Sequence, residues 1–148
     1  MRTAADRLAA ILESVPQRLA AIPDAEAELQ PAPGRWSKKE ILGHLIDSAS
    51  NNHQRIVRAL LAQRIDFPAY EQESWVALQG YVTEAWSDLV NLWLLLNRHL
   101  LHVIRTIPET ALSNECAVGG KAPMPLPVLI AGYLEHLDHH LDQVLGGG

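Results

Sequence analysis

Apolar residues recur every three or four positions along most of this chain, which is the spacing of one face of an α-helix. The pattern predicts four long amphipathic helices, and no stretch of alternating apolar and polar residues predicts a strand. The expected helices cover residues 3–22, 37–63, 82–105 and 126–144. Four such helices joined by shorter segments are typical of a bundle, so we predict an all-α four-helix fold.

Residues at the helix ends support these boundaries. Ser37 is a good N-cap, and Glu40 lies three residues later, where it can complete a capping box. Pro127 falls in the first turn of the last helix, where its missing amide costs nothing. Pro16 lies within the first helix and predicts either a kink or a break just before it. We interpret the remaining stretches, 23–35, 64–73 and 109–125, as loops, with a short helix ending at Gly80.

The length of the chain indicates a single domain. A chain of 148 residues buries roughly two-thirds of its surface on folding. We therefore expect one domain over residues 1–145, followed by a disordered glycine tail at 146–148. A single cysteine excludes an internal disulfide, and Cys116 lies in a polar, glycine-containing run that is typical of an incidental loop thiol rather than a nucleophile.

Charge and hydropathy exclude two classes of partner. The formal net charge is -5, from 17 acidic and 12 basic residues, so the chain lacks the positive surface that nucleic-acid phosphates require. No apolar run reaches the length of about 18 residues that a membrane-spanning helix needs. The first residues also lack the features of an export signal. We expect a soluble, cytoplasmic protein with no nucleic-acid or membrane partner.

Three of the seven histidines lie inside the last predicted helix, in one stretch of five residues. Measured from the centre of its apolar face, His140 lies roughly 50° away, His136 roughly 90° and His139 roughly 150°. His136 and His140 therefore share the flank next to the core, and His139 faces solvent. Imidazoles at positions i and i+4 can bind one transition-metal ion. The alternative to metal binding, on the evidence of the pair alone, is that one histidine packs in the core and the other lies at the surface.

A catalytic metal site needs a third protein ligand, and helical phase leaves its identity open. His99 and His102 point away from the apolar stripe of their helix and are expected to face solvent. His44 and His53 are nine residues apart, which places them about half a turn out of phase and about 13 Å apart along the helix axis. They cannot bind one ion together, and periodicity does not choose between them.

Two segments together resemble the DinB superfamily, whose members share the DinB/YfiT-like fold. They are WSKKEILGHLIDSASNNHQR near the start of the second long helix and EHLDHHLDQV in the last helix. The resemblance implies a four-helix bundle, often a homodimer, with three histidines that bind nickel or zinc. Carried over by position, these ligands are His44, His136 and His140. The resemblance thus selects His44, and His53 is expected near the pocket or packed.

The same resemblance implies a metal-dependent transferase that uses a low-molecular-weight thiol and acts on a small molecule. Two alternatives stay open: a metal-dependent hydrolase, and a non-catalytic, dimerising interaction module. The metal would lower the pKa of a bound water or thiol. No general base or nucleophile besides the predicted metal site is visible in the sequence.

Neighbouring polar residues are candidates for supporting roles. A histidine ligand usually donates its second ring N–H to a carboxylate, a carbonyl or water. Asp47 is within helical reach of the first histidine, and Gln143 is within reach of the last. The alternative for Asp47 is an exposed acid on the helix flank. Arg55 and Arg58 are candidates for lining a pocket for an anionic thiol, or they simply solvate a helix face.

Overall fold

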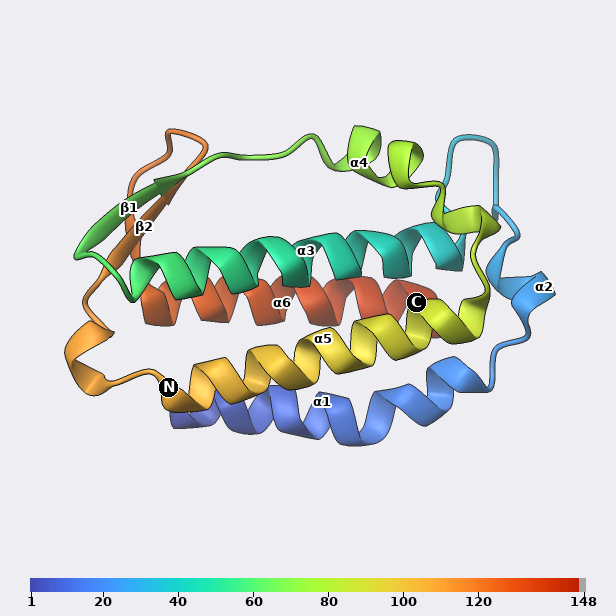
Figure 1. The fold of residues 1–148 in the computed structure, drawn as a ribbon. Coiled ribbons are helices and arrows are strands. Elements are labelled where there is room, and N and C mark those ends of the chain that lie inside the picture. The colour runs from blue at the N-terminus through green and yellow to red at the C-terminus, as the bar shows by residue number, and fades with distance from the viewer. Residues whose placement is uncertain (147–148) are drawn as a thin grey trace.

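Four long helices form a bundle in the computed structural model, which describes residues 1–146 (Figure 1). The helices α3 and α6 lie side by side, and α5 and α1 complete the bundle, with α3 packed against α5 and α1 packed against both α5 and α6. This arrangement confirms the predicted four-helix bundle. The long helices are α1 (Arg2–Ala20), α3 (Lys38–Ala59), α5 (Trp86–Thr106) and α6 (Leu126–Leu145).

The helix ends follow the local signals in most places. Ser37 Oγ accepts a hydrogen bond from the Glu40 amide at 3.2 Å, and Glu40 Oε2 accepts one from the Ser37 amide at 2.7 Å, so the predicted capping box is present. Pro16 does not break α1, which continues to Ala20. Buried leucine and valine side chains on both sides of Pro16 hold this helix against the bundle, which offsets the lost backbone hydrogen bond.

A small sheet occupies two segments that we had interpreted as loops. Strand β1 (Arg64–Phe67) pairs in parallel with β2 (Glu115–Val118), and β2 pairs antiparallel with β3 (Met124–Pro125). Strands of two to four residues are too short to show an alternating pattern, and the parallel partners β1 and β2 lie far apart in the sequence. Cys116 is completely buried in β2, so its assignment to a loop is wrong.

Short helical segments connect the main elements. They are α2 (Asp24–Ala27), α4 (Gln72–Gln79) and the 3₁₀ turns Tyr81–Thr83 and Glu109–Ala111. As predicted, α4 ends at Gly80, which has a left-handed backbone with φ of 64°. Because a 3₁₀ turn precedes α5, that helix begins at Trp86 and not at residue 82, where the sequence predicted its start. Residues 68–80, which we call the strap, run along α3 and include α4 (Figure 1).

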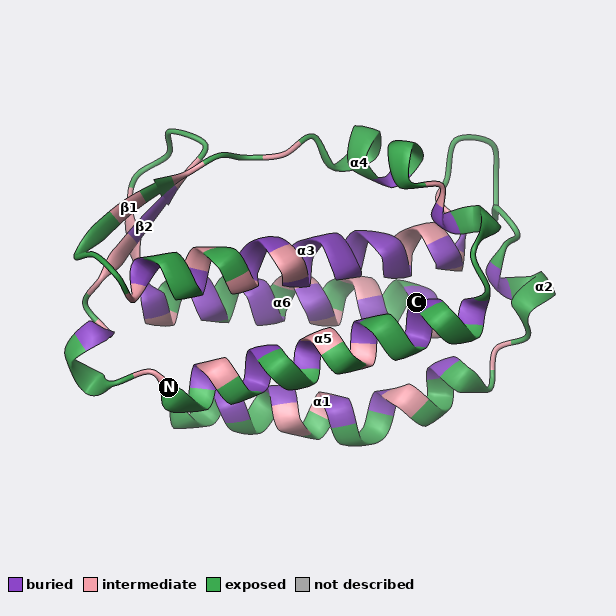
Figure 2. Ribbon diagram, in the orientation of Figure 1, coloured by how far each residue is buried: buried purple, intermediate pink, exposed green. Residues whose placement is uncertain are grey.

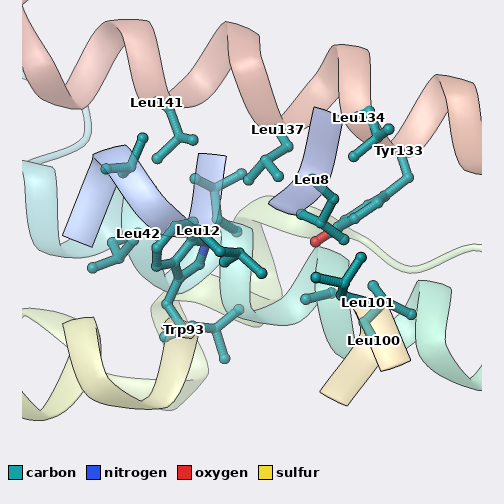
Figure 3. Packing of buried hydrophobic residues seen from close by; sticks show 14 of the residues in the cluster. Leu8, Leu12, Leu42, Trp93, Leu100, Leu101, Tyr133, Leu134, Leu137 and Leu141 are labelled. Atoms are coloured by element: carbon teal, nitrogen blue, oxygen red, sulfur yellow. The ribbon is translucent and has the colours of Figure 1, made fainter. Parts of the chain in front are cut away.

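The core lies between the long helices, with Trp93 of α5 among leucines of its neighbours (Figure 3). Trp86 is also buried, and its indole N–H donates a hydrogen bond to the Leu19 carbonyl at 2.8 Å. Buried residues mark the inner faces of the helices, and α3 is buried around most of its middle turns (Figure 2). This helix therefore has more than one inward face, because α5, α6 and the strap all pack against it.

The C-terminal end of the described chain is a helix cap. Gly146 follows α6 with φ of 75°, and the rest of the tail predicted to be disordered, residues 147–148, lies outside the described residues. None of the helices in residues 1–146 has the length and apolarity to cross a bilayer.

Candidate metal site

Three histidines meet where α3 faces α6. His44 extends from α3, and His136 and His140 extend from successive turns of α6. One ring nitrogen from each of them lies within 4.8 Å of the others. The Nε2 atoms of His44 and His136 are 2.9 Å apart, and the ring centroids of His136 and His140 are 4.5 Å apart. The structure thus brings together the three residues that the resemblance selected.

Burial keeps these rings in the form that a metal ion requires. His44 is 1% exposed, and the other two rings are half-buried. Burial, and then the neighbouring histidines, lower the pKa of His44 to about 4. The same causes lower the pKa of His136 to about 4, and burial lowers the pKa of His140. All three rings are neutral at pH 7, so metal binding displaces no proton from their lone pairs.

Polar side chains on the same two helices orient two of the rings. Ser48 Oγ lies 3.4 Å from Nδ1 of His136, and Gln143 Oε1 lies 2.9 Å from Nδ1 of His140. These contacts occupy the outer nitrogens and leave the Nε2 atoms facing the shared point. The structure places Gln143 beside His140, where helical spacing had put it. Sequence reasoning missed Ser48, although its position four residues after His44 marks the same helix face.

Asp47 has a different partner from the one we expected. Its side chain is buried, and Oδ1 accepts hydrogen bonds from the Tyr81 hydroxyl at 2.7 Å and from Gln79 Nε2 at 2.8 Å. Burial raises its pKa. Among the described residues, neither Asp47 Oδ2 nor Nδ1 of His44 has a hydrogen-bond partner. Asp47 is therefore neither an exposed acid nor a hydrogen-bond partner of His44; it anchors the chain that follows α4.

The other histidines are not part of the triad, although the ring of His139 lies beside that of His140, with centroids 5.0 Å apart. His53 is half a turn out of phase with His44, and its ring contacts His99 of α5 with centroids 5.1 Å apart. Within the described chain, His53 lines neither of the cavities next to the triad. His99, His102 and His139 are exposed, as their helical directions predicted.

Two cavities adjoin the triad on different sides. The first, of about 460 Å³, contains His140, and we call it the Trp36 cavity. The second, of about 470 Å³, contains His44 and His136, and we call it the Arg55 cavity. Gln72, at the start of α4, lines both of them. Through Gln72, the strap therefore borders both cavities beside the triad.

The two arginines named from the sequence have different surroundings. Arg55 is half-buried and lines the Arg55 cavity. Arg58, one turn later, is exposed and donates a hydrogen bond to Gln54 at 3.4 Å. Of the two, only Arg55 is placed to contact a molecule bound beside the triad.

The residues present fit a divalent metal ion. Three neutral imidazoles converge from a rigid pair of helices, and two of them have their second nitrogen already engaged. Without an ion, two Nε2 lone pairs at 2.9 Å repel each other unless one nitrogen carries a proton. A cation between them removes that conflict. The triad can therefore hold a metal ion, and the three histidines leave coordination positions open toward the cavities.

The sequence model of the DinB superfamily matches residues 6–144. The chain belongs to the DinB superfamily. No curated protein matches this member of the superfamily significantly by sequence.

Two solved structures share the fold of this DinB superfamily protein. YfiT from Bacillus subtilis, described as a probable metal-dependent hydrolase with an unusual four-helix bundle topology, matches with a TM-score of 0.78 and 22% identity over 95% of this chain and 83% of its own. The mycothiol-dependent maleylpyruvate isomerase matches with a TM-score of 0.77 and 16% identity over 95% of this chain. This second match spans 58% of the isomerase chain. Identities this low establish the fold.

Proposed function

We propose that this DinB superfamily protein is a metal-dependent transferase that joins a low-molecular-weight thiol to a small electrophilic molecule. In this proposal His44, His136 and His140 bind nickel or zinc. The observation that carries it is that the triad lines two cavities, His140 one of them and His44 with His136 the other. A transfer between two organic molecules needs two binding spaces that meet at one reactive centre, whereas hydrolysis needs one such space and a water molecule.

The side chains around the triad have distinct roles in this proposal. Ser48 and Gln143 orient the rings of His136 and His140. Trp36 packs beside His44, with ring centroids 5.2 Å apart, and limits the access of water from the Trp36 cavity. The metal would supply Lewis acidity that lowers the pKa of a thiol placed next to it. The protein then needs no separate general base.

Nickel and zinc are the metals that the family resemblance implies, and a donor set of three neutral nitrogens is compatible with both. Imidazole suits zinc, nickel, copper and iron, whereas magnesium and calcium prefer oxygen ligands. Three protein ligands with open positions are also the usual composition of a catalytic zinc site.

Elemental analysis of protein purified without a polyhistidine tag tests the metal site. We expect metal near one ion per chain, and its loss when His136→Ala and His140→Ala are combined. The matched control is His102→Ala, which removes an exposed histidine of α5 that is not part of the triad. Retention of metal by the double variant, or no metal in the wild type after supplementation with nickel or zinc, would contradict the proposal and favour a non-catalytic bundle.

Incubating the metal-loaded protein with a small electrophile and candidate thiols tests the transfer. We expect consumption of the electrophile that depends on the thiol and is lost with the metal. The second candidate is a metal-dependent hydrolase, which the structural likeness to YfiT favours. Turnover that is independent of thiol would support this second candidate and refute thiol transfer. Sedimentation velocity tests the homodimer that the family resemblance implies.

A further inference from the structure

A polar stripe on α3 leads from the triad into the Arg55 cavity. Ser48, Asn52 and Arg55 follow His44 at intervals of four, four and three residues, so all four project from one side of the helix. From His44 to Arg55 the helix makes three full turns and about 20° more, and it rises by about 16 Å. The two side chains therefore point in nearly the same direction. All four residues line the cavity. One surface therefore connects the proposed metal site with a guanidinium group.

The guanidinium group of Arg55 lies in an environment with few partners. Its central carbon lies 5.4 Å from the centroid of the Phe67 ring, and Nη1 lies 3.5 Å from Asn52 Oδ1. Its Nε is buried and has no hydrogen-bond partner among the described residues. Burial lowers the pKa of Arg55, which is the cost of keeping this cation out of water.

No carboxylate within the described chain forms an ion pair with Arg55. The described residues that line the Arg55 cavity include two cations, Arg55 and Lys121, and no aspartate or glutamate. The Trp36 cavity, in contrast, contains Arg35 and Glu73. A cavity lined by uncompensated cations in a protein with a formal net charge of -5 favours an anion over a neutral molecule.

We propose that the Arg55 cavity binds an oxyanion group, a carboxylate or a phosphate, of the substrate that reacts at the triad. Arg55 presents parallel N–H donors to two oxygens of this group, as guanidinium groups do for carboxylates and phosphates. Lys121 adds a second positive charge at the cavity. The reactive part of the molecule then lies beside His44 and His136. This inference rests on the proposed function and defines its substrate class as small anions.

Nuclear magnetic resonance of the full-length protein tests the anion site directly, in zinc-loaded and metal-free samples. The probes are benzoate, phenyl phosphate and the neutral benzamide. We expect benzoate or phenyl phosphate to shift the Arg55 Nε–H resonance with saturation, and benzamide to leave it unchanged. The tighter of the two anions identifies the group as a carboxylate or a phosphate. An unchanged Arg55 resonance with both anions would overturn the proposal.

Two arginine variants separate a specific contact from general charge. Arg55→Gln is expected to weaken anion binding by about 10-fold or more, because it removes charge-assisted hydrogen bonds. Arg58→Gln removes the same charge one turn away on the exposed face and is expected to leave binding within about twofold of wild type. Equal weakening by the two variants would refute a specific site. Circular dichroism of both variants checks that they fold.

The two proposals fail in different ways. Metal content is measured on the same samples, so absence of metal counts against the proposed function alone. Anion binding by the metal-free protein still reports on Arg55 in that case. Metal binding without any anion-induced shift at Arg55 would reject the substrate class and leave the metal site in place.

Discussion

Replacing Gly43 by alanine tests how closely α3 packs against the residues that follow the strap. A Cβ at this position would lie 2.1 Å from Cδ2 and 2.3 Å from Cγ of Tyr81. Carbon atoms do not approach so closely without bonding, so the tyrosine ring has to move. Tyr81 is buried, and its hydroxyl donates a hydrogen bond to Asp47 at 2.7 Å. The substitution therefore disturbs both the packing and this hydrogen bond.

The magnitude follows from three contributions to the free energy of unfolding. Overpacking a filled site costs about 1–3 kcal/mol. Losing a hydrogen bond to the buried Asp47 carboxylate costs about 1.5–3 kcal/mol. Alanine in place of glycine within a helix raises the free energy of unfolding by about 1 kcal/mol, which offsets part of this loss. We expect Gly43→Ala to lower the free energy of unfolding by about 1.5–5 kcal/mol.

Gly132 of α6 provides a matched control of opposite sign. It also lies within a long helix, and no described atom outside the neighbouring backbone of that helix comes within 4 Å of an added Cβ. Gly132→Ala should therefore raise the free energy of unfolding by up to about 1 kcal/mol. Urea denaturation of metal-free protein, followed by circular dichroism, measures both values. A Gly43→Ala protein as stable as the wild type would refute the packing argument.

Three further predictions concern the helix cap, the acid response and the ring orientation. Ser37→Ala should lower the free energy of unfolding by about 1 kcal/mol, measured in urea, because it removes the N-cap of α3; an unchanged midpoint would contradict the capping role. The pKa of His44 and of His136 falls from 6.5 to about 4 on folding, so the unfolded chain binds more protons between these values. Stability of the metal-free protein should therefore decrease as the pH falls from 6.5 to 4, and a variant that lacks both rings should lose much of this slope in pH-dependent urea titrations. Gln143→Ala should weaken metal binding by about 10- to 100-fold in competition with a chelator, and equal affinity would argue against its role in orienting His140.

The long helices were predictable because their signals are local. Apolar spacing located all four, and the cap formed by Ser37 and Glu40 marked the start of α3. The small sheet was not predictable, since its strands contain two to four residues and β1 pairs with β2 across about fifty positions of sequence. Pro16 is a further case, because packing on both sides of it keeps α1 continuous.

The candidate site was predictable in part. Helical direction separated the pair His136 and His140 from the exposed His139, because α6 has one buried face and one exposed face. The same reasoning could not choose between His44 and His53. Their helix, α3, packs against α5, α6 and the strap, so opposite sides of it are both inward and the apolar stripe has no single direction.

By itself, therefore, the sequence determined the long helices, the N-cap of α3 and the pair of histidines on α6, all of which depend on residues within a few positions of one another. The tertiary structure decided which side of α3 each histidine faces: His44 faces α6, and His53 faces α5. It also placed Asp47 with Tyr81, and it placed Arg55 in a cavity beside the triad whose lining, among residues 1–146, includes no carboxylate. These outcomes depend on which helices and strap pack together, and that packing joins segments that are distant in the sequence.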